Sequence, residues 1–512
     1  AGAQTYHYSA LSMLDSTTGV DGTHHTLRYD AAGRLIRRTS GKAFETRSYD
    51  WDDHVSTRAN SKFSDTFAYD ARGKLTQAVS QPTYWGVDSS TMVYDGFGAL
   101  VVHNRVPTIG TATADEFQAD GFGNVVRHDL NRGLNDGRSA TVQSYSAGRM
   151  VDVAADTLPG LTDPHDESQP LIKTYTDTYA MFDSVGNQTQ TNTSVATWSS
   201  FAHTYVTASS GQSWLRNFYN GADQPKLSER QAYFMHSSSL YIRTTEEDYF
   251  YDALGRRVAL RTRRDSSCTE FDGAPWGDEC TQPMDRFIWD GADLITELRD
   301  YGGWDTDPVT VNGNGSGGRI QNTYAPGVLG QDVPLSVKPS WATGFVPWPT
   351  WHGTFESGTF TDSTDMTSYS WPARTNGLYF TPDQRITPLI PNGWWGSLID
   401  GKQSATGLMY DRNRYYSPES GQFTQGDPIG LAGGLNSYGF ANGDPVNSSD
   451  PFGLCKVDVR AKSLGLGQVH TFITTTEPDD TRTTLYRGGP GKHNSDKETQ
   501  EKSNNAGADK ES

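Results

Sequence analysis

A short tyrosine–aspartate unit recurs along the first three-fifths of the chain and restricts the possible folds more than any other feature. In its clearest form an aromatic residue precedes Asp, two variable residues, Gly and a return to strand-forming residues. Clear copies begin at Tyr29, Tyr69, Tyr94 and Tyr251, and looser copies begin at Tyr49, Ala119, Phe182, Tyr219 and Trp289. Asp30, Asp50 and Asp70 are evenly spaced, as expected for a structural repeat.

Each part of the unit has a physical role in a β-hairpin. Asp or Asn can accept a hydrogen bond from the backbone two residues later and so open a turn. Gly three residues after Asp supplies a left-handed backbone position at no steric cost. The copies therefore predict strand, tight turn and strand in series. Hairpins in series must bury their faces against neighbours, which predicts a winding antiparallel sheet, although unrelated turns in a β-sandwich would also produce hairpins.

Composition agrees with an all-β chain and narrows its partners. Glycine is abundant at 53 residues, aromatics reach 12%, and hydrophobic residues are only 34% of 512, which suits many short strands. The net charge of −18 disfavours nucleic acid as a partner of the whole chain. No apolar run has the length of a membrane-spanning helix. The first residues, from Ala1 to Gln4, do not read as a signal peptide and indicate a fragment or a processed product.

Two Asp-Pro-x-Gly-Leu blocks follow the repeats. Asp427 heads the first block and Asp450 heads the second. Asp, Pro and Gly at these positions are good turn formers, so the blocks could simply be two turns that cap the array. A functional interpretation requires the two carboxylates to lie together, because one can then stay protonated while the other activates water. That division of labour suits peptide hydrolysis.

The repeats resemble the YD repeats of bacterial Rhs proteins, of the C component of Tc toxins and of teneurins. The segment from Gly407 to Leu454 resembles the Rhs-associated core. This resemblance implies long antiparallel hairpin repeats that wind into a hollow shell, closed by the core. It also implies that Asp427 and Asp450 are a catalytic pair that cuts the Leu454–Cys455 bond. Some relatives carry Arg before the first aspartate where this chain has Gly426, so Arg412 and Arg414 are the candidates for that role.

Four regions are expected. Residues 1–303 form the YD-repeat shell, and residues 393–454 form the core with the self-cleavage site. Residues 304–392 are an aromatic and proline-rich insertion, either a plug or cap on the shell or a face that binds carbohydrate or a partner. Residues 455–512 are a variable C-terminal segment, a toxin or its stub, with a predicted hairpin over 469–476 and 483–487.

The three cysteines leave alternatives open. Cys268 and Cys280 flank a loop and either form a disulfide or remain two free thiols. Cys455 and His470 could be a thiol nucleophile and its base in the C-terminal segment, whereas a lone His in a strand is usually structural. No Cys/His spacing is typical of zinc, and neither a metal nor a cofactor is expected.

The sequence therefore favours a toxin shell that encloses its own C-terminal segment and releases it by a single-turnover aspartyl self-cleavage, in the manner of toxins used in interbacterial competition. The expected partners are that segment, an N-terminal part or partner subunit that closes the shell, an immunity protein and a secretion machinery. The expected location is outside the producing cell, secreted or at a cell surface. The alternatives are a teneurin-like adhesion scaffold and a half-shell chaperone of a Tc-type complex.

Overall fold

The structure is a computed structural model of the 512-residue chain. It describes most of the first half of the chain and a compact segment near residue 430. The described residues are 4–264, 284–300, 319–325, 334–339, 344–349, 355–362, 366–367, 406–454, 458–463, 469–476 and 483–487. Short gaps within these spans fall at 20–21, 61–62, 83–86, 109–111, 132–137, 147–148, 156–161, 164–165, 171–173, 200, 202–203, 237–238, 418–419, 434–435, 441–449 and 451.

One sheet of 27 strands contains nearly all the regular structure. It is an antiparallel meander in which each strand pairs with the next member along the chain. Its first part is β1 (Thr5–Tyr8), β2 (Leu14–Thr18), β3 (His24–Tyr29), β4 (Leu35–Ser40), β5 (Ala43–Tyr49), β6 (Val55–Ala59), β7 (Phe63–Tyr69), β8 (Leu75–Pro82), β9 (Asp88–Tyr94), β10 (Leu100–Pro107), β11 (Thr113–Ala119), β12 (Val125–Asn131), β13 (Arg138–Ser146) and β14 (Arg149–Ala155).

The same sheet continues through β17 (Thr174–Phe182), β18 (Gln188–Ser199), β19 (Thr204–Tyr219), β20 (Pro225–His236), β21 (Ser239–Tyr251), β22 (Arg257–Arg264), β23 (Met284–Asp290), β24 (Asp293–Asp300), β25 (Arg319–Ala325), β26 (Ser336–Pro339), β27 (Phe345–Pro349), β28 (Phe355–Phe360) and β29 (Met366–Thr367). The described strands within residues 304–392 thus extend the sheet. The predicted all-β fold of antiparallel hairpins is confirmed.

Three smaller sheets complete the secondary structure. One is the pair β15 (Thr162–Asp163) and β16 (Asp166–Pro170), and the second is β30 (Met409–Asp411), β31 (Arg414–Ser417) and β32 (Gln422–Phe423), followed by a 3₁₀ helix at Gly430–Gly433. The third contains β33 (Asp458–Ser463), β34 (Val469–Thr476) and β35 (Thr483–Arg487). The hairpin predicted over 469–476 and 483–487 is therefore present as the antiparallel pair β34–β35.

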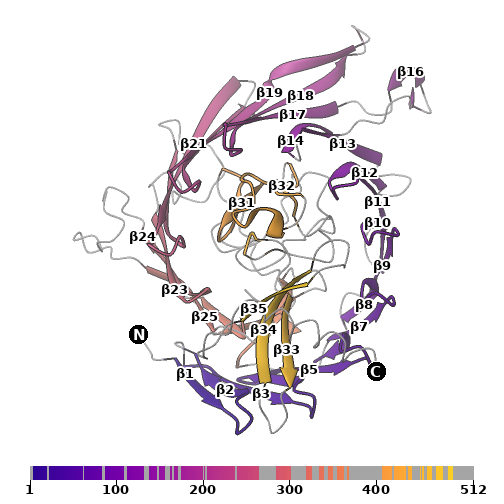
Figure 1. Ribbon diagram of the computed structural model, residues 1–512. Helices are drawn as coiled ribbons and strands as arrows, with labels where there is room; N and C mark the ends of the chain where they lie inside the picture. Colours follow the sequence, from indigo (N-terminus) through magenta and orange to yellow (C-terminus); the bar gives the residue numbers. More distant parts are fainter. Residues whose placement is uncertain are drawn as a thin grey trace.

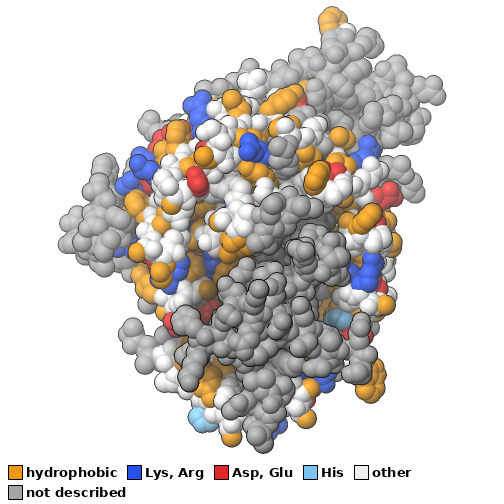
Figure 2. Space-filling view, viewed as in Figure 1, with side chains coloured by type: hydrophobic (Ala, Val, Ile, Leu, Met, Phe, Trp, Pro, Cys, Tyr) orange, Lys and Arg blue, Asp and Glu red, His pale blue; other side chains and the backbone are white. Residues whose placement is uncertain are grey.

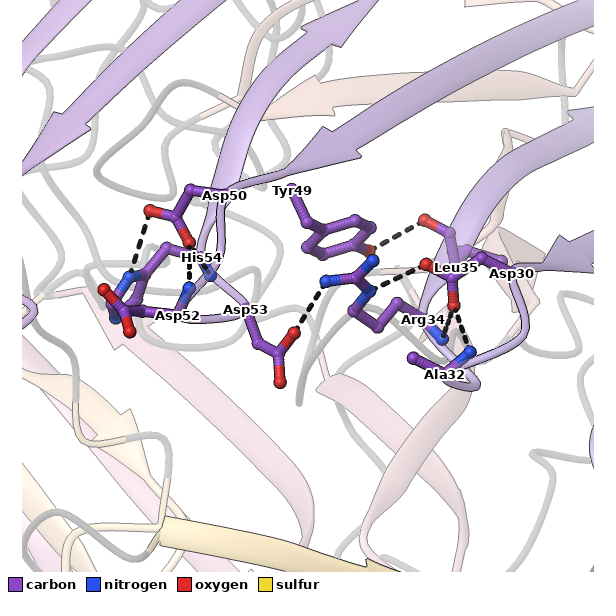
Figure 3. Close-up of polar contacts among 9 residues, drawn as sticks. All are labelled: Asp30, Ala32, Arg34, Leu35, Tyr49, Asp50, Asp52, Asp53 and His54. Carbon is purple, nitrogen blue, oxygen red and sulfur yellow. Dashed lines mark hydrogen bonds and ion pairs between the residues drawn. The ribbon is translucent and has the colours of Figure 1, made fainter. Parts of the chain in front are cut away.

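The turn of the repeat has the geometry that its sequence predicts. In the β3–β4 hairpin, the Asp30 carboxylate accepts hydrogen bonds from the backbone N–H groups of Ala32 and Arg34, at 3.0 and 2.9 Å (Figure 3). Gly33 has a φ of +83° and donates its N–H to the Asp30 carbonyl. This is a three-residue hairpin loop, a type I turn followed by a left-handed residue. The neighbouring turn repeats the arrangement around Asp50 (Figure 3).

In most units, the aromatic residue ties its repeat to the preceding one. The Tyr49 hydroxyl donates to the Leu35 carbonyl at 2.8 Å (Figure 3), and the Tyr69 hydroxyl donates to the Val55 carbonyl at 3.0 Å. The bond recurs along the sheet from Tyr29, Tyr94, Tyr145, Tyr219 and Tyr251, and the Trp289 indole does the same. We call this series the tyrosine ladder. It links successive hairpins through the face of the sheet in addition to the backbone bonds between strands.

The sheet bends into a ring (Figure 1). Its strands run from β1–β5 at the bottom, through β7–β12 on the right and β13–β19 at the top, to β21–β25 on the left, with β31 and β32 inside. An early and a late part of the sheet touch: the N–H of Lys42, in the β4–β5 turn, donates to the carbonyl of Thr361, just after β28, at 2.8 Å, and a small apolar cluster joins Leu27 and Leu35 to Leu335. The ring therefore positions residues 406–454 against strands from several repeats.

Several buried positions of the sheet carry charged pairs rather than apolar side chains. Arg38 of β4 bonds to Glu45 of β5, and both side chains are 2% exposed. Burial disfavours the charged form of Glu45, but Arg38 and further arginines outweigh burial and lower the pKa of Glu45 to about 2. Arg58 and Asp65 form a similar buried pair on β6 and β7. These pairs lock neighbouring strands, because removing one partner would strand a buried charge.

Apolar and charged side chains are mixed on the visible face of the sheet. Figure 2 shows apolar, basic and acidic side chains interspersed over the described part of this face. Neither sign of charge gathers there into one field.

Candidate functional site

The segment from Thr406 to Leu454, called the core here, packs inside the ring through a cluster of tyrosines. Tyr410, Tyr415 and Tyr416 are each at most 2% exposed and share one apolar cluster with residues of the sheet. The Arg257 N–H donates to the Tyr410 hydroxyl at 2.8 Å, and the Arg257 guanidinium lies 4.3 Å from the centre of that ring. Burial raises the pKa of Tyr415, and the nearby Arg257 partly offsets that effect. These contacts fix β30 and β31 against β22.

Arg414, on β31, joins the two predicted catalytic carboxylates. Its Nη2 lies 3.1 Å from Asp427 Oδ2 and 3.2 Å from Asp450 Oδ2. The side chains of Arg414 and Asp427 are 0% exposed and that of Asp450 is 2% exposed. The two aspartates, far apart in the sequence, therefore contact the same nitrogen. A buried cation between two carboxylates offsets the repulsion that would otherwise separate them.

Each nitrogen of the Arg414 guanidinium has a hydrogen-bond partner in this position. Nη1 donates to the Ser437 carbonyl at 2.9 Å, and Nε donates to the Gly453 carbonyl. Its flat face lies 3.7 Å from the centre of the Phe423 ring. Such a fixed planar fork of donors is a property of Arg that Lys does not share. Arg414 thus holds both aspartates and the chain immediately before Leu454 at one point.

The Asp427 block forms a turn around its own carboxylate. Oδ1 accepts the Ile429 N–H at 2.9 Å, and the Asp427 carbonyl accepts the Gly430 N–H at 2.9 Å. The other oxygen faces Arg414 and lies so close to Gly433 that a side-chain carbon there would overlap it. The Asp427 N–H donates to the Ser437 carbonyl at 2.8 Å. One carboxylate therefore both caps a turn and enters the charged cluster.

The Asp450 block has the same division between its two oxygens. Oδ1 accepts the Leu454 N–H at 3.0 Å, whereas Oδ2 faces Arg414. Gly453 has a φ of +61°, and a side-chain carbon on it would press against the backbone around Asp411 and Arg414. The Asn413 side chain also donates to the Phe452 carbonyl at 2.8 Å. Asp450 is thus hydrogen-bonded to the residue whose carbonyl belongs to the predicted scissile bond.

The segment that carries Asp427 is held by turns of the sheet. The Asn124 side-chain oxygen accepts from Gln422 and Asn436, at 3.0 and 2.5 Å. The Tyr438 hydroxyl donates to the Gly186 carbonyl at 2.8 Å, and the Gln188 N–H donates to the Thr424 carbonyl at 2.7 Å. These partners belong to the β11–β12 and β17–β18 connections. The sheet therefore helps to place Asp427, although none of these residues is close in sequence.

The structure distinguishes between the two arginine candidates. Gly426 lies beside Tyr438, with ordinary van der Waals space for a side-chain carbon. Arg412 turns to the sheet, where its guanidinium donates to the Ala292 carbonyl at 2.9 and 3.2 Å. Arg414 alone of the two reaches both aspartates. The roles of Asn124, Gly186 and Tyr438 were not predicted. For Asn124 and Gly186, the signal in the sequence was the Gly-Asn ending shared by the turns at 120–124 and 183–187.

Other predicted residues lie wholly or partly outside the part of the chain that the structure describes. Cys268, Cys280 and Cys455 lie outside the described residues, so the disulfide and the thiol nucleophile stay predictions. His470 lies on β34, where its backbone pairs with Lys462, and its side chain is outside the description. Within the described part of the chain, no group of three His, Cys, Asp or Glu side chains could hold a metal ion. No helix among the same residues is long and apolar enough to cross a membrane.

Comparison with known proteins gives partial matches. No family model matches the chain. It is 27% identical over 247 residues to the probable deoxyribonuclease RhsA of Dickeya dadantii, covering 46% of this chain and 14% of RhsA. It is 26% identical over 228 residues to toxin protein Tse5 of Pseudomonas aeruginosa, covering 41% of this chain and 15% of Tse5. Toxin subunit YenC2 of Yersinia entomophaga is 39% identical over 57 residues, 11% of this chain and 6% of YenC2.

Solved structures are similar at lower identity. A Tc holotoxin pore of Photorhabdus luminescens aligns with a TM-score of 0.43 at 14% identity, over 91% of this chain and 22% of that chain. In each of the sequence matches above, the aligned part is 15% or less of the relative's own length. The tyrosine–aspartate turns, the paired Asp-Pro-x-Gly-Leu blocks and the matches to RhsA, Tse5 and YenC2 make this chain similar to proteins of the Rhs/YD-repeat family.

Proposed function

We propose that this chain is an Rhs-type toxin shell that encloses its own C-terminal segment and frees it by aspartyl self-cleavage of the Leu454–Cys455 bond. The observation that carries the proposal is the contact of one Arg414 nitrogen with both Asp427 and Asp450. The Leu454 N–H bond to Asp450 supports it further, because it brings a carboxylate to the residue before the bond.

The proposed reaction is a single hydrolysis. One carboxylate accepts a proton from a water molecule, whose oxygen attacks the Leu454 carbonyl carbon. The other carboxyl, in its protonated form, gives its proton to the departing nitrogen of Cys455 as the C–N bond breaks. Arg414 holds the two groups together and is not consumed. The products are a new carboxyl end at Leu454 and a free amino end at Cys455.

Enclosure of the C-terminal segment is supported by the position of the core. β31 and β32 lie within the ring (Figure 1), and their side chains share an apolar cluster with the sheet, which favours a path of the following chain inside the curve of the sheet. The names of Tse5 and YenC2, a toxin protein and a toxin subunit, favour a toxic role for that segment. The same names favour delivery out of the producing cell. A secretion machinery and an immunity protein are the further partners of this proposal.

The test is an intact-mass measurement on three purified variants. Asp427→Asn and Asp450→Asn should each abolish release of residues 455–512, because an amide neither takes nor gives the required proton. Asp95→Asn is the matched control: it makes the same change in a turn aspartate, and Asn220 already opens an equivalent turn. The proposal fails if both site variants still release the segment at the rate of the unmodified chain.

One observation favours a second candidate, a half-shell that needs a partner to cover it. Large apolar side chains stand exposed at the tips of several turns, namely Trp51, Phe97, Phe122, Val185 and Leu254. Contiguous exposed apolar side chains mark interfaces, so this candidate requires that the tips gather into one patch. Sedimentation of the purified chain tests this candidate. If the unmodified chain and the Phe97→Ser variant are both stable monomers, the exposed tips have no interface role.

A further inference from the structure

The two aspartates of the site depend on different parts of the ring. The Asp427 arm, residues 422–433 and 436–440, is bound to the turns at 120–124 and 183–187. The Asp450 arm, Asp450 with residues 452–454, is bound to Asn413 and Arg414. Their neighbour Arg412 contacts Ala292 and Phe452. In Figure 1, β12 and β17 lie on the right and at the top of the ring, whereas β23 and β24 lie on the left.

Tyr438 makes the most specific of these contacts. Its hydroxyl donates to the Gly186 carbonyl at 2.8 Å, and its ring meets the edge of Phe182 at 6.0 Å between centres. The Arg149 guanidinium lies 5.7 Å from the centre of the same ring. Gly186 has a φ of +102°, and a side-chain carbon built on it would overlap the Tyr438 hydroxyl. The turn at 183–187 and Tyr438 are therefore shaped to fit each other.

The backbone of Tyr438 carries that contact to the carboxylate pair. The Tyr438 carbonyl accepts the Phe423 N–H at 3.0 Å, next to the ring that lies under Arg414. The preceding carbonyl, of Ser437, accepts both from the Asp427 N–H and from Arg414 Nη1. A displacement of Tyr438 would thus move an acceptor shared by Asp427 and Arg414.

We propose that Tyr438 is a positioning residue, and that its seat on Gly186 makes self-cleavage conditional on the correct folding of the ring around the core. The proposal rests on the proposed function, since it concerns the regulation of that same site. The aspartates meet only after the 120–124 and 183–187 turns hold one arm and the Ala292 side of the ring holds the other. Cleavage would then be delayed until the segment to be released is surrounded.

The test follows cleavage during cell-free synthesis of the full chain, as the fraction of chains cut over time. Tyr438→Phe removes one hydrogen bond and should slow cleavage about five- to tenfold. Gly186→Ala pushes Tyr438 away and should slow cleavage by about two orders of magnitude, because a displacement of about 1 Å can cost that much. Gly98→Ala is the matched control, with a φ of +85° and only Lys74 Cε near the added carbon, at 3.6 Å.

A double variant separates positioning from general damage. In Gly186→Ala combined with Tyr438→Phe, the hydroxyl that collides with the added carbon is gone, and the nearest remaining contact is Arg149 Nη2, at the end of a flexible side chain, at 3.0 Å. Cleavage should therefore recover toward the rate of Tyr438→Phe alone, which a merely weakened turn would not allow. The proposal is overturned if Tyr438→Phe and Gly186→Ala cut at the unmodified rate while Asp427→Asn blocks cutting. By contrast, cutting in Asp427→Asn at the unmodified rate overturns the proposed function instead.

A measurement that needs no cleavage completes the test. In the Asp427→Asn background, Gly186→Ala should increase hydrogen–deuterium exchange in peptides covering residues 422–438 and leave residues 24–82 unchanged. Gly98→Ala should leave the 422–438 peptides unchanged. Unaltered exchange of those peptides in Gly186→Ala would overturn the coupling between Gly186 and the Asp427 arm.

Discussion

The early repeats and the core reach order by opposite routes. In β3 to β8, the turns at 30–34, 50–54 and 70–74 are each closed by their own Asp, and Tyr49 and Tyr69 bond to a carbonyl about one repeat earlier. In the core, Arg414 bonds to residues from three separate stretches, and the arm that carries Asp427 is bound to Asn124 and Gly186. Local contacts cost little loop entropy, whereas the contacts of the core require the distant chain to be in place. The difference teaches that the ring can form by addition of repeats, but the site can form only on the ring.

The largest effect that would separate the two regions is expected from Arg414→Met. Without the cation, two buried carboxylates face each other, which costs about 3–5 kcal/mol of unfolding free energy by analogy with other broken buried pairs. Cleavage should stop as well. Chemical unfolding and intact mass check both effects. Arg105→Met, which breaks a partly exposed pair with Asp88 in the repeats, is the control, and equal behaviour of the two variants would contradict the role given to Arg414.

Glu45→Gln should produce an effect of similar kind in the repeats, at about 3 kcal/mol, because Arg38 loses its buried carboxylate. Hydrogen–deuterium exchange should rise in β4 to β6 and stay unchanged in residues 406–454. The matched variant Asp88→Asn breaks a half-exposed pair with Arg105 and should cost less than about 1 kcal/mol. Faster exchange in the core of Glu45→Gln would show that the repeats are less independent than their contacts indicate.

A smaller effect, about 1 kcal/mol, is expected for Tyr69→Phe, which removes one rung of the tyrosine ladder. Tyr251→Phe sharpens the comparison, because the Tyr251 hydroxyl contacts both the Pro225 carbonyl and the Tyr415 hydroxyl. Tyr69→Phe should raise exchange only around β6 and β7, whereas Tyr251→Phe should also raise it in β31. Identical exchange patterns away from the mutated strands would contradict the distinction.

The smallest effect per site is expected from acid. Burial opposes ionisation of Asp30 and Asp70, yet hydrogen bonds from the turn backbone and from nearby Arg side chains lower the pKa of both. A lowered pKa in the folded state stabilises the fold above the ordinary value of about 4, and that stabilisation is lost as the pH falls through the folded pKa. The thermal midpoint should therefore drop between about pH 4 and pH 2. Asp70→Asn should flatten this drop slightly, and a midpoint that rises on acidification would contradict the sign.

The sequence predicted the parts of the molecule that depend on neighbouring residues. The Asp, the left-handed Gly and the hairpin they form need only five residues, so turn chemistry was sufficient to predict them. The tyrosine ladder was not predicted, because the carbonyl that Tyr49 meets depends on how far one hairpin is offset from the last. The buried Arg38–Glu45 pair was missed for the same reason: alternation predicts an inward position, but not which charges will meet there.

For the site, the prediction of Asp427 and Asp450 came from resemblance and from their matching turns, not from spacing. The role of Arg414 depended on a meeting between β31 and two later blocks, which no local pattern specifies. Gly426 stands where some relatives carry Arg, so the sequence left Arg412 and Arg414 as alternatives for that role. The contribution of Asn124, Gly186 and Tyr438 was out of reach because it joins chain segments about 250 to 300 residues apart. The catalytic roles of Asp427 and Asp450 and the positioning role of Tyr438 are predictions that the variants above test.

The contact of the β3–β5 region with the β25–β28 region has a mechanical consequence. Neighbouring strands within the sheet share several backbone hydrogen bonds. The strands β7 and β8, for example, are paired at seven positions. Where these two regions meet, the described contacts are the backbone bond from Lys42 to Thr361, the side-chain bonds of Ser40 with Leu335 and of Ser336 with His25, and a small apolar cluster. Among the described contacts, this seam has fewer backbone bonds than a hairpin. We therefore expect a pulling force or an outward pressure to open the ring at the seam between β3–β5 and β25–β28 first.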